Sequence, residues 1–137
     1  FVQILPAQIA SDCTLIRHGS PELVDLAEAK LAGEEVRLDA VRAAAQPMFD
    51  APDGHRIDVG VLACTHFPLL RPELQRAYPS VYWIDGGPGI ARRIAYLTRE
   101  QRWPAKPKPG TMVFTAEPRS PLLGSLANYG IGEVRTL

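Results

Sequence analysis

The chain has 137 residues, a length typical of one compact domain. Hydrophobic residues make up 46% of it, which is enough for an ordinary core and too many for a disordered chain. Fifteen basic residues balance fifteen acidic ones without a basic cluster, so charge gives no reason to expect nucleic acid or an anionic membrane as a partner. The apolar stretch at residues 59–64 is much shorter than the ~20 residues that cross a bilayer.

The first predicted elements are a strand at residues 13–17 and a helix at residues 20–31. Ser20 is a preferred N-cap, Pro21 suits the first helical position, and leucines follow at helical spacing until Gly33 ends the pattern. A second helix is predicted at residues 38–48, and a turn follows at residues 51–54.

The middle of the chain predicts a strand, a helix and another strand. Residues 57–63 are apolar and partly β-branched, which favours a strand buried on both faces, as in a parallel sheet. Pro68 and Pro72 bracket the start of a helix predicted at residues 69–77, and residues 81–84 predict the next strand.

Pro88 opens a further helix, in which Ile90, Ile94 and Leu97 recur at helical spacing. A linker rich in proline and lysine follows at residues 104–110. The end of the chain predicts a strand at 111–115, a helix at 122–129 and a strand at 133–137. This alternation predicts an α/β fold with a mainly parallel sheet flanked by helices.

Cys64, Thr65 and His66 directly follow the strand predicted at residues 57–63, and ligands of parallel sheets bind beyond the carboxyl ends of strands. Cys64 and His66 are two residues apart, so their side chains share one side if the strand continues through them. A nearby imidazole or helix start raises the thiolate fraction of a cysteine, whose reference pKa is ~8.5. The alternative is that both residues are ordinary core residues.

Other candidates give weaker signals. Glu28 lies beside the apolar stripe of the first helix, where a solvated carboxylate is the common role. No grouping of His, Cys, Asp and Glu has the spacing of a zinc site. Residues 85–89 are rich in glycine but match no nucleotide-binding motif, although a backbone site for a small carboxylate remains open there. Cys13 and Cys64 are too few for a disulfide framework, so we expect free thiols and a cytoplasmic location.

Residues 61–70, Val-Leu-Ala-Cys-Thr-His-Phe-Pro-Leu-Leu, resemble the C-terminal catalytic motif of glutamate racemases, members of the aspartate/glutamate racemase superfamily. Residues 19–28 resemble the family's upstream helix, residues 84–93 its Ile-Asp-Ser-Gly stretch, and residues 114–135 its last strand, helix and strand. The resemblance covers essentially the whole chain and implies the C-terminal half of such an enzyme. Ala63 replaces the usual glycine and Gly86 the usual serine, and we expect these changes to tune activity.

The resemblance also implies roles for individual residues. Cys64 corresponds to one of two catalytic cysteines, and Thr65 contributes to holding the substrate carboxylate. His66 assists Cys64, and the carboxylate of Glu28 supports that histidine. Cys13 matches no catalytic motif of the family, whose other cysteine belongs to an N-terminal half.

By this resemblance the enzyme is an isomerase that interconverts L- and D-glutamate without cofactor or metal. It supplies D-glutamate for peptidoglycan biosynthesis, and so for cell wall biogenesis and cell shape. Inversion requires a base on one face of Cα and an acid on the other, with fixed donors around the developing charge. Cys64 is then the base for L-glutamate and the acid in reverse, and we expect the chain to be inactive alone.

The sequence begins at Phe1 without an initiator methionine, and we expect an α/β half with a second catalytic cysteine upstream. Residues 1–84 are expected to form most of the family's second (middle) domain, and residues 85–137 to return and pack on the N-terminal domain. The expected partners are glutamate and that missing half, while a homo-oligomer remains open. The alternative functions are an aspartate or hydantoin racemase, a non-catalytic carboxylate-binding domain, or a cysteine hydrolase, for which no oxyanion hole is evident.

Overall fold

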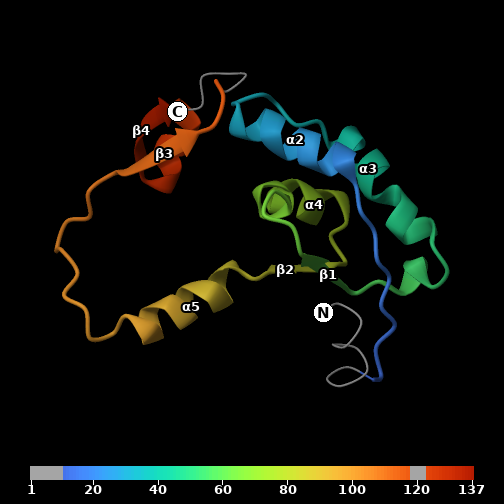
Figure 1. Cartoon of the computed structure of the whole chain (residues 1–137). Helices are drawn as coiled ribbons and strands as arrows, with labels where there is room; N and C mark the ends of the chain where they lie inside the picture. Colours follow the sequence, from blue (N-terminus) through green and yellow to red (C-terminus); the bar gives the residue numbers. More distant parts are fainter. Residues whose placement is uncertain (1–10, 118–122) are drawn as a thin grey trace.

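The computed structural model describes residues 11–117 and 123–137 (Figure 1). Strands β1 (Val59–Leu62) and β2 (Tyr82–Asp85) pair in parallel, and so do β3 (Gly110–Phe114) and β4 (Ile131–Thr136). The helices are α2 (Pro21–Leu31), α3 (Leu38–Asp50), α4 (Arg71–Ala77), α5 (Gly87–Leu97) and α6 (Leu123–Leu126), with short 3-10 helices η1 (Gly54–Arg56), η2 (Phe67–Leu70) and η3 (Ala127–Tyr129). Parallel strands alternating with helices confirm the predicted α/β class.

Helix α2 begins and ends where the sequence predicts. The Ser20 hydroxyl accepts a hydrogen bond from the Leu23 backbone N–H at 3.1 Å and donates one to the Glu22 carboxylate at 2.9 Å. Pro21 occupies the first turn. The helix ends at Leu31, and Gly33 follows with φ of +88°, a left-handed conformation in which a side chain would be strained.

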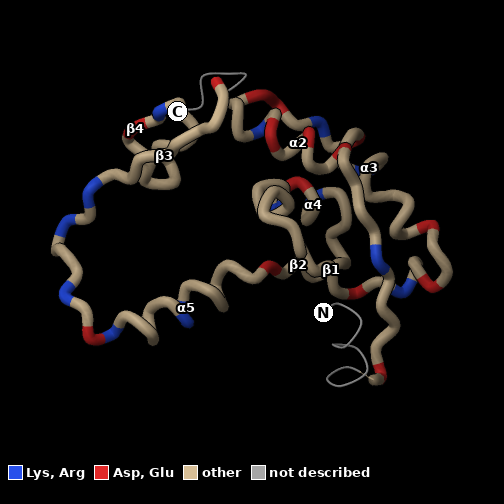
Figure 2. Tube along the Cα trace, viewed as in Figure 1, with Lys and Arg blue, Asp and Glu red and all other residues tan. Residues whose placement is uncertain are grey.

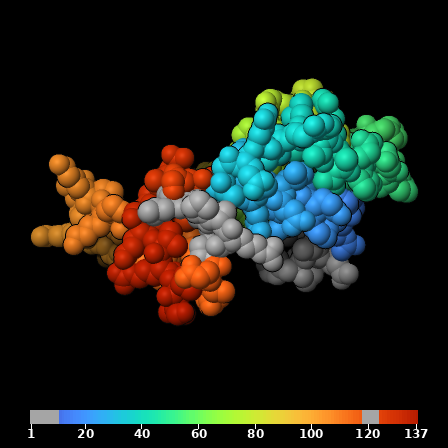
Figure 3. Space-filling view, turned by 90° about the horizontal axis from the view of Figure 1, so that it is seen from above, coloured from blue at the N-terminus to red at the C-terminus, as the bar shows by residue number. Residues whose placement is uncertain are grey.

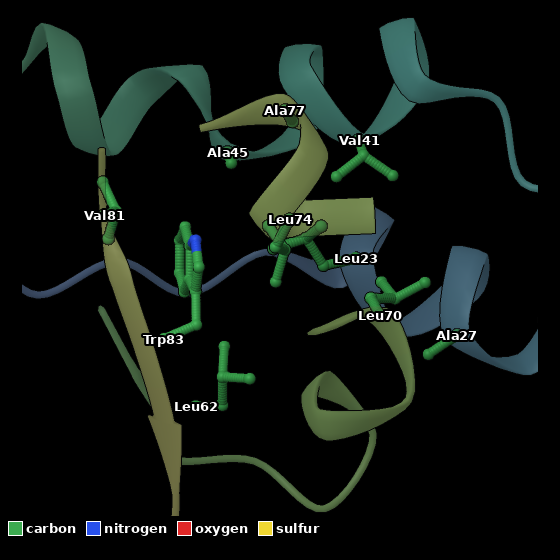
Figure 4. Packing of buried hydrophobic residues seen from close by; sticks show 10 residues of the cluster. All are labelled: Leu23, Ala27, Val41, Ala45, Leu62, Leu70, Leu74, Ala77, Val81 and Trp83. Carbon is green, nitrogen blue, oxygen red and sulfur yellow. The ribbon is translucent and has the colours of Figure 1, made fainter. Parts of the chain in front are cut away.

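Helices α2, α3 and α4 gather on one side of the β1–β2 sheet (Figure 1) and enclose the core. The core consists of apolar residues from these helices, from η2 and from the inward face of the sheet (Figure 4): Leu23, Ala27, Val41, Ala45, Leu62, Leu70, Leu74, Ala77, Val81 and Trp83. Gly60 is the point of closest approach, because a Cβ there would lie 2.3 Å from the Trp83 ring. The sheet therefore needs glycine at this position.

The prediction that the strand after residue 57 is buried on both faces is wrong. The strand is β1, shorter than predicted, and its side chains alternate between exposed and buried. Val59 is 46% exposed and Val61 64%, and the neighbouring Tyr82 on β2 is 65% exposed. The reason is that helices of the described chain cover only one face of this sheet.

Other predicted elements differ in part from the structure. Residues 13–17 pair with no strand of the described chain, so the strand predicted there is wrong. Helix α3 continues two residues beyond its predicted end and contains Pro47. The last helix is divided into α6 and η3, and residue 122 lies outside the described residues. In the part that the structure describes, no helix is long and apolar enough to cross a membrane.

After β2 the chain leaves the compact region. Helix α5 extends away from the other helices (Figure 1), and none of its residues is buried. The linker that follows projects at one end of the molecule (Figure 3), and Lys and Arg recur along it (Figure 2). Helix α6, which lies between β3 and β4 in the sequence, returns to the turn after α2, where a Cβ on Gly33 would lie 3.8 Å from the Ser125 hydroxyl.

Candidate functional site

The candidate site is the loop of residues 63–66, between the carboxyl end of β1 and the start of η2. Leu62, the last residue of β1, is in register with Asp85, the last residue of β2, so the loop lies at the carboxyl edge of this parallel pair. That is the edge at which ligands of parallel sheets bind. The sequence placed Cys64 and His66 on one side on the condition that the strand continues through them. The strand ends at Leu62, so this condition is not met.

A bend in the loop nevertheless brings Cys64 and His66 together. The Cys64 Sγ lies 3.7 Å from the His66 Nδ1, and both side chains are partly buried. The Thr65 hydroxyl is 3.5 Å from the same nitrogen, at the outer limit of a hydrogen bond. The thiol and the imidazole are therefore placed for direct proton exchange.

The surroundings of Cys64 favour its thiolate. The backbone N–H of His66 makes the largest contribution to lowering the pKa of the thiol below its ordinary value, and the His66 imidazole makes the next. The backbone N–H of Phe67 acts in the same direction, while desolvation opposes it. These N–H groups belong to the residues at the start of η2, so backbone donors at this turn favour the thiolate.

Glu28 reaches the same histidine from the opposite side of the ring. Its Oε1 lies 3.5 Å from the His66 Nε2, while the side chains of Glu28 and His66 are 62% and 37% exposed. One residue of α2 and two of the loop thus form a continuous series of carboxylate, imidazole and thiol. A carboxylate at Nε2 stabilises an imidazolium that forms when Nδ1 takes a proton.

In the glycine-rich segment at the start of α5, a backbone donor is already bound by the Asp85 side chain. The Gly87 backbone N–H donates to Asp85 Oδ1 at 2.7 Å, and Arg71 Nη1 lies 3.6 Å from Asp85 Oδ2. This donor is therefore already used, which weakens the idea of a substrate carboxylate bound there. Sequence reasoning missed the pairing of Arg71 with Asp85, since the two residues lie in different elements and no local pattern joins them.

The site is open to solvent. Thr65 and Val61 are exposed, and a shallow hollow nearby reaches Phe67 but is otherwise lined by the start of α2, at Gly19, Ser20, Pro21, Val24 and Asp25. Over residues 11–117 and 123–137, no three His, Cys, Asp or Glu side chains gather as a metal site requires. Within the described residues, the loop that carries Cys64 and His66 therefore lies beside an open surface and not in an enclosed pocket.

Similarity to known proteins is found with individual relatives and with a solved structure. No family model matches the chain. A glutamate racemase of Sphingopyxis alaskensis is 51% identical over 100% of this chain and 52% of its own length. One of Klebsiella pneumoniae is 42% identical over 95% of this chain and 47% of its own length. The crystal structure of Escherichia coli glutamate racemase in complex with L-glutamate and the activator UDP-MurNAc-ala superposes with a TM-score of 0.75 at 35% identity, covering 98% of this chain and 52% of that one.

An α/β fold with parallel strands, and similarity to these proteins along essentially the whole of this chain, indicate a homologue of amino-acid racemases. Within that class the proteins similar to it are glutamate racemases, the family that its sequence motifs also resemble. The chain spans about half the length of the curated relatives it matches.

Proposed function

We propose that this chain is the C-terminal half of a glutamate racemase, in which Cys64 exchanges a proton with Cα of glutamate. The observation that carries the proposal is the 3.7 Å contact between the Cys64 Sγ and the His66 Nδ1, at a thiol whose pKa is lowered. The 51% identity to a glutamate racemase and the likeness to a structure containing L-glutamate give the substrate class.

In this mechanism the Cys64 thiolate removes the α-proton of L-glutamate. The Cα–H bond breaks, an S–H bond forms, and the electron pair remains on the α-carbon and its carboxylate. A second thiol, on the opposite face, then gives its proton to Cα and completes the inversion. In the reverse direction Cys64 is the donor, so each thiol must hold and release a proton in turn.

The neighbouring residues serve that exchange. His66 Nδ1 takes the Cys64 proton and keeps the sulfur reactive, and Glu28 stabilises the imidazolium that results. The Thr65 hydroxyl, exposed beside the thiol, donates to the substrate carboxylate, where charge develops in the transition state. No step needs a metal or an organic cofactor, because acid and base chemistry alone inverts the centre.

The rest of the active site is provided by the other half of the enzyme. Residues 1–84 form most of the middle domain, and residues 85–137 return to the N-terminal domain, although residues 1–10 and 118–122 lie outside the described residues. Two features support this division. The outer face of β1 exposes Val59 and Val61, and α5 exposes Ile90 and Ile94. Apolar surface of this kind marks an interface that is covered in the complete enzyme.

The biological role that follows is supply of D-glutamate for peptidoglycan in the cytoplasm. Two free cysteines are compatible with that location. Beyond the missing half, the only partner we propose is the substrate, and a homo-oligomer is not required by the mechanism.

The test mixes this chain with the N-terminal half of the Sphingopyxis alaskensis racemase in deuterium oxide. We expect deuterium at Cα of glutamate together with conversion of D- to L-glutamate. Cys64→Ala is expected to abolish both signals, and Cys13→Ala, which changes an exposed thiol far from the loop in sequence, is the matched control.

The other outcomes separate the alternatives. Exchange with aspartate or a hydantoin but not glutamate would assign a related racemase. Glutamate binding without exchange by a mixture shown to associate would favour a carboxylate-binding domain, and substrate cleavage would favour a hydrolase. Each of these results contradicts the proposal.

A further inference from the structure

Lys30 connects the helix that carries Glu28 to the segment that follows His66. Its Nζ donates to the Leu69 backbone carbonyl at 2.7 Å and to the Glu73 Oε2 at 2.7 Å. Leu69 belongs to η2 and Glu73 to α4. A single ammonium group therefore joins α2 to both elements that continue the catalytic loop.

The acceptors make this contact more than a surface ion pair. Glu73 is only 7% exposed and is the single charged residue buried in the part of the chain that the structure describes. Its second oxygen lies 3.4 Å from Arg76 Nη2, but the Arg76 side chain is 64% exposed and the pair is local to α4. A buried carboxylate must be paired, and Lys30 is the partner that comes from another element.

The position of Lys30 on α2 gives the contact a geometric consequence. Ala27 is fully buried at the centre of the face that α2 turns to the core, where Figure 4 shows it beside Leu70. Each residue turns an α-helix by about 100°, so Glu28 and Lys30 lie on opposite edges of the strip that Ala27 centres. One edge meets His66 and the other meets Leu69 and Glu73. Two polar contacts thus fix both the rotation and the height of α2 against η2.

We propose that Lys30 is a positioning residue of the catalytic loop, which keeps the Glu28 carboxylate within reach of the His66 ring by holding α2 against η2 and α4. The inference rests on the roles proposed for Cys64, His66 and Glu28. Without this hold, only apolar packing at Leu23 and Ala27 sets the position of α2 against η2. The 3.5 Å contact between Glu28 and His66 is longer and more exposed than the contact between Lys30 and Glu73. We therefore expect the contact between Glu28 and His66 to lengthen when Lys30 is replaced.

The experiment follows Cys64 directly and needs no substrate or second half. In a Cys13→Ser background only one thiol remains, and its alkylation by iodoacetamide is measured from pH 5 to pH 9 by mass spectrometry. Lys30→Met keeps the apolar stem and removes the ammonium. We expect the rate at pH 7 to fall roughly 2- to 5-fold and the midpoint to rise, because alkylation follows the thiolate fraction.

Two controls separate positioning from loss of stability. Arg76→Met removes a cation from the same Glu73 carboxylate without touching η2, and it should leave the Cys64 rate unchanged. Lys30→Met combined with Glu73→Met removes the unpaired buried charge as well, so the fold is retained while the link between elements is lost. That variant should still show the slower alkylation.

A double-mutant comparison identifies the route of the effect. Glu28→Gln alone should slow alkylation, and adding Lys30→Met to it should change little, since both act through one contact. The proposal is overturned if Lys30→Met keeps the parental rate in a folded protein, or if its full effect persists in the Glu28→Gln background. It is also overturned if Glu28→Gln has no effect. A failed racemase assay does not alter any of these outcomes, so the two proposals are judged separately.

Discussion

Residues 20–85 and residues 86–137 use their apolar side chains in different ways. In the first region, ten apolar residues from helices and strands form one buried cluster. In the second, α5 has an equally regular apolar stripe, yet Ile90 is 62% exposed, Ile94 53% and Leu97 61%. An amphipathic pattern therefore encodes a face that can be buried but not the partner that buries it, because the pattern is local and the partner is not.

The strongest test of this difference is catalytic. If the exposed stripe and the outer face of β1 meet a second half that carries the opposing acid, the isolated chain lacks a positioned proton donor. We expect its conversion of D- to L-glutamate to be lower by ~10²–10⁴-fold or more than that of the mixture with the N-terminal half of a relative. Equal rates for the isolated chain and the mixture, measured by circular dichroism, would refute the two-thiol assignment.

Truncating one apolar residue in each region should separate them by stability. Leu74 is 1% exposed, so Leu74→Ala is expected to lower the free energy of unfolding by ~2–5 kcal/mol. Ile94→Ala removes a side chain that is 53% exposed, and the free energy of unfolding should change by no more than about 0.5 kcal/mol. Urea denaturation followed by circular dichroism measures both. A similar loss in the two variants would mean that α5 is part of the cooperative core.

One glycine in each region allows a further comparison of their packing. A methyl group on Gly60 would lie 2.3 Å from the buried Trp83 ring, so Gly60→Ala should cost ~1–3 kcal/mol of stability through overpacking. On α5, Gly89 has no atom within 4 Å of an added Cβ, and Gly89→Ala should stabilise the helix by ~0.5–1 kcal/mol. Thermal unfolding of the pair gives the signs, and destabilisation by Gly89→Ala would show that this surface is already in contact.

The smallest expected effect concerns Cys64, at the edge of the compact region. Because the folded protein lowers the pKa of this thiol, its alkylation midpoint should lie at lower pH in the folded chain than in urea. A lowered pKa contributes stability above the pKa of the unfolded thiol, and that stability is lost as the pH falls through the folded value. His66→Gln should raise the midpoint only part of the way, since the backbone N–H groups of residues 66 and 67, which also lower the pKa of the thiol, remain. A complete return to the unfolded midpoint would contradict the contribution of these backbone groups.

Local chemistry made part of this molecule predictable from its sequence. The Ser20 cap and the Gly33 turn concern neighbouring residues, and helix α2 therefore begins and ends as expected. The sequence also placed Cys64 and His66 on one side, but by a continued strand, whereas a bend in the loop brings them together. Glu28 was identified only by the resemblance of residues 19–28 to the family's upstream helix, because its position beside the apolar stripe indicated no more than a solvated carboxylate.

What could not be predicted depends on distant parts of the chain. Residues 13–17 have strand character, but a strand needs a ladder partner, and the described chain offers none to them. The exposed face of β1 has the same origin, since burial on both faces requires a second layer. The contacts of Lys30 with Leu69 and Glu73 join segments far apart in sequence, so no local pattern predicts them.

The chain has two tryptophans, and each belongs to one of the two regions. Trp83 is 3% exposed within the core, and its indole N–H is buried without a hydrogen-bond partner, while Trp103 follows α5 and is 66% exposed. Their emission should therefore differ in colour and in access to a dissolved quencher. Acrylamide should quench the longer-wavelength emission of Trp103 and have little effect on the shorter-wavelength emission of Trp83. Assembly with a second half that reaches the linker would shield the emission of Trp103 alone, so the natural fluorescence of the protein can report on association without any attached label.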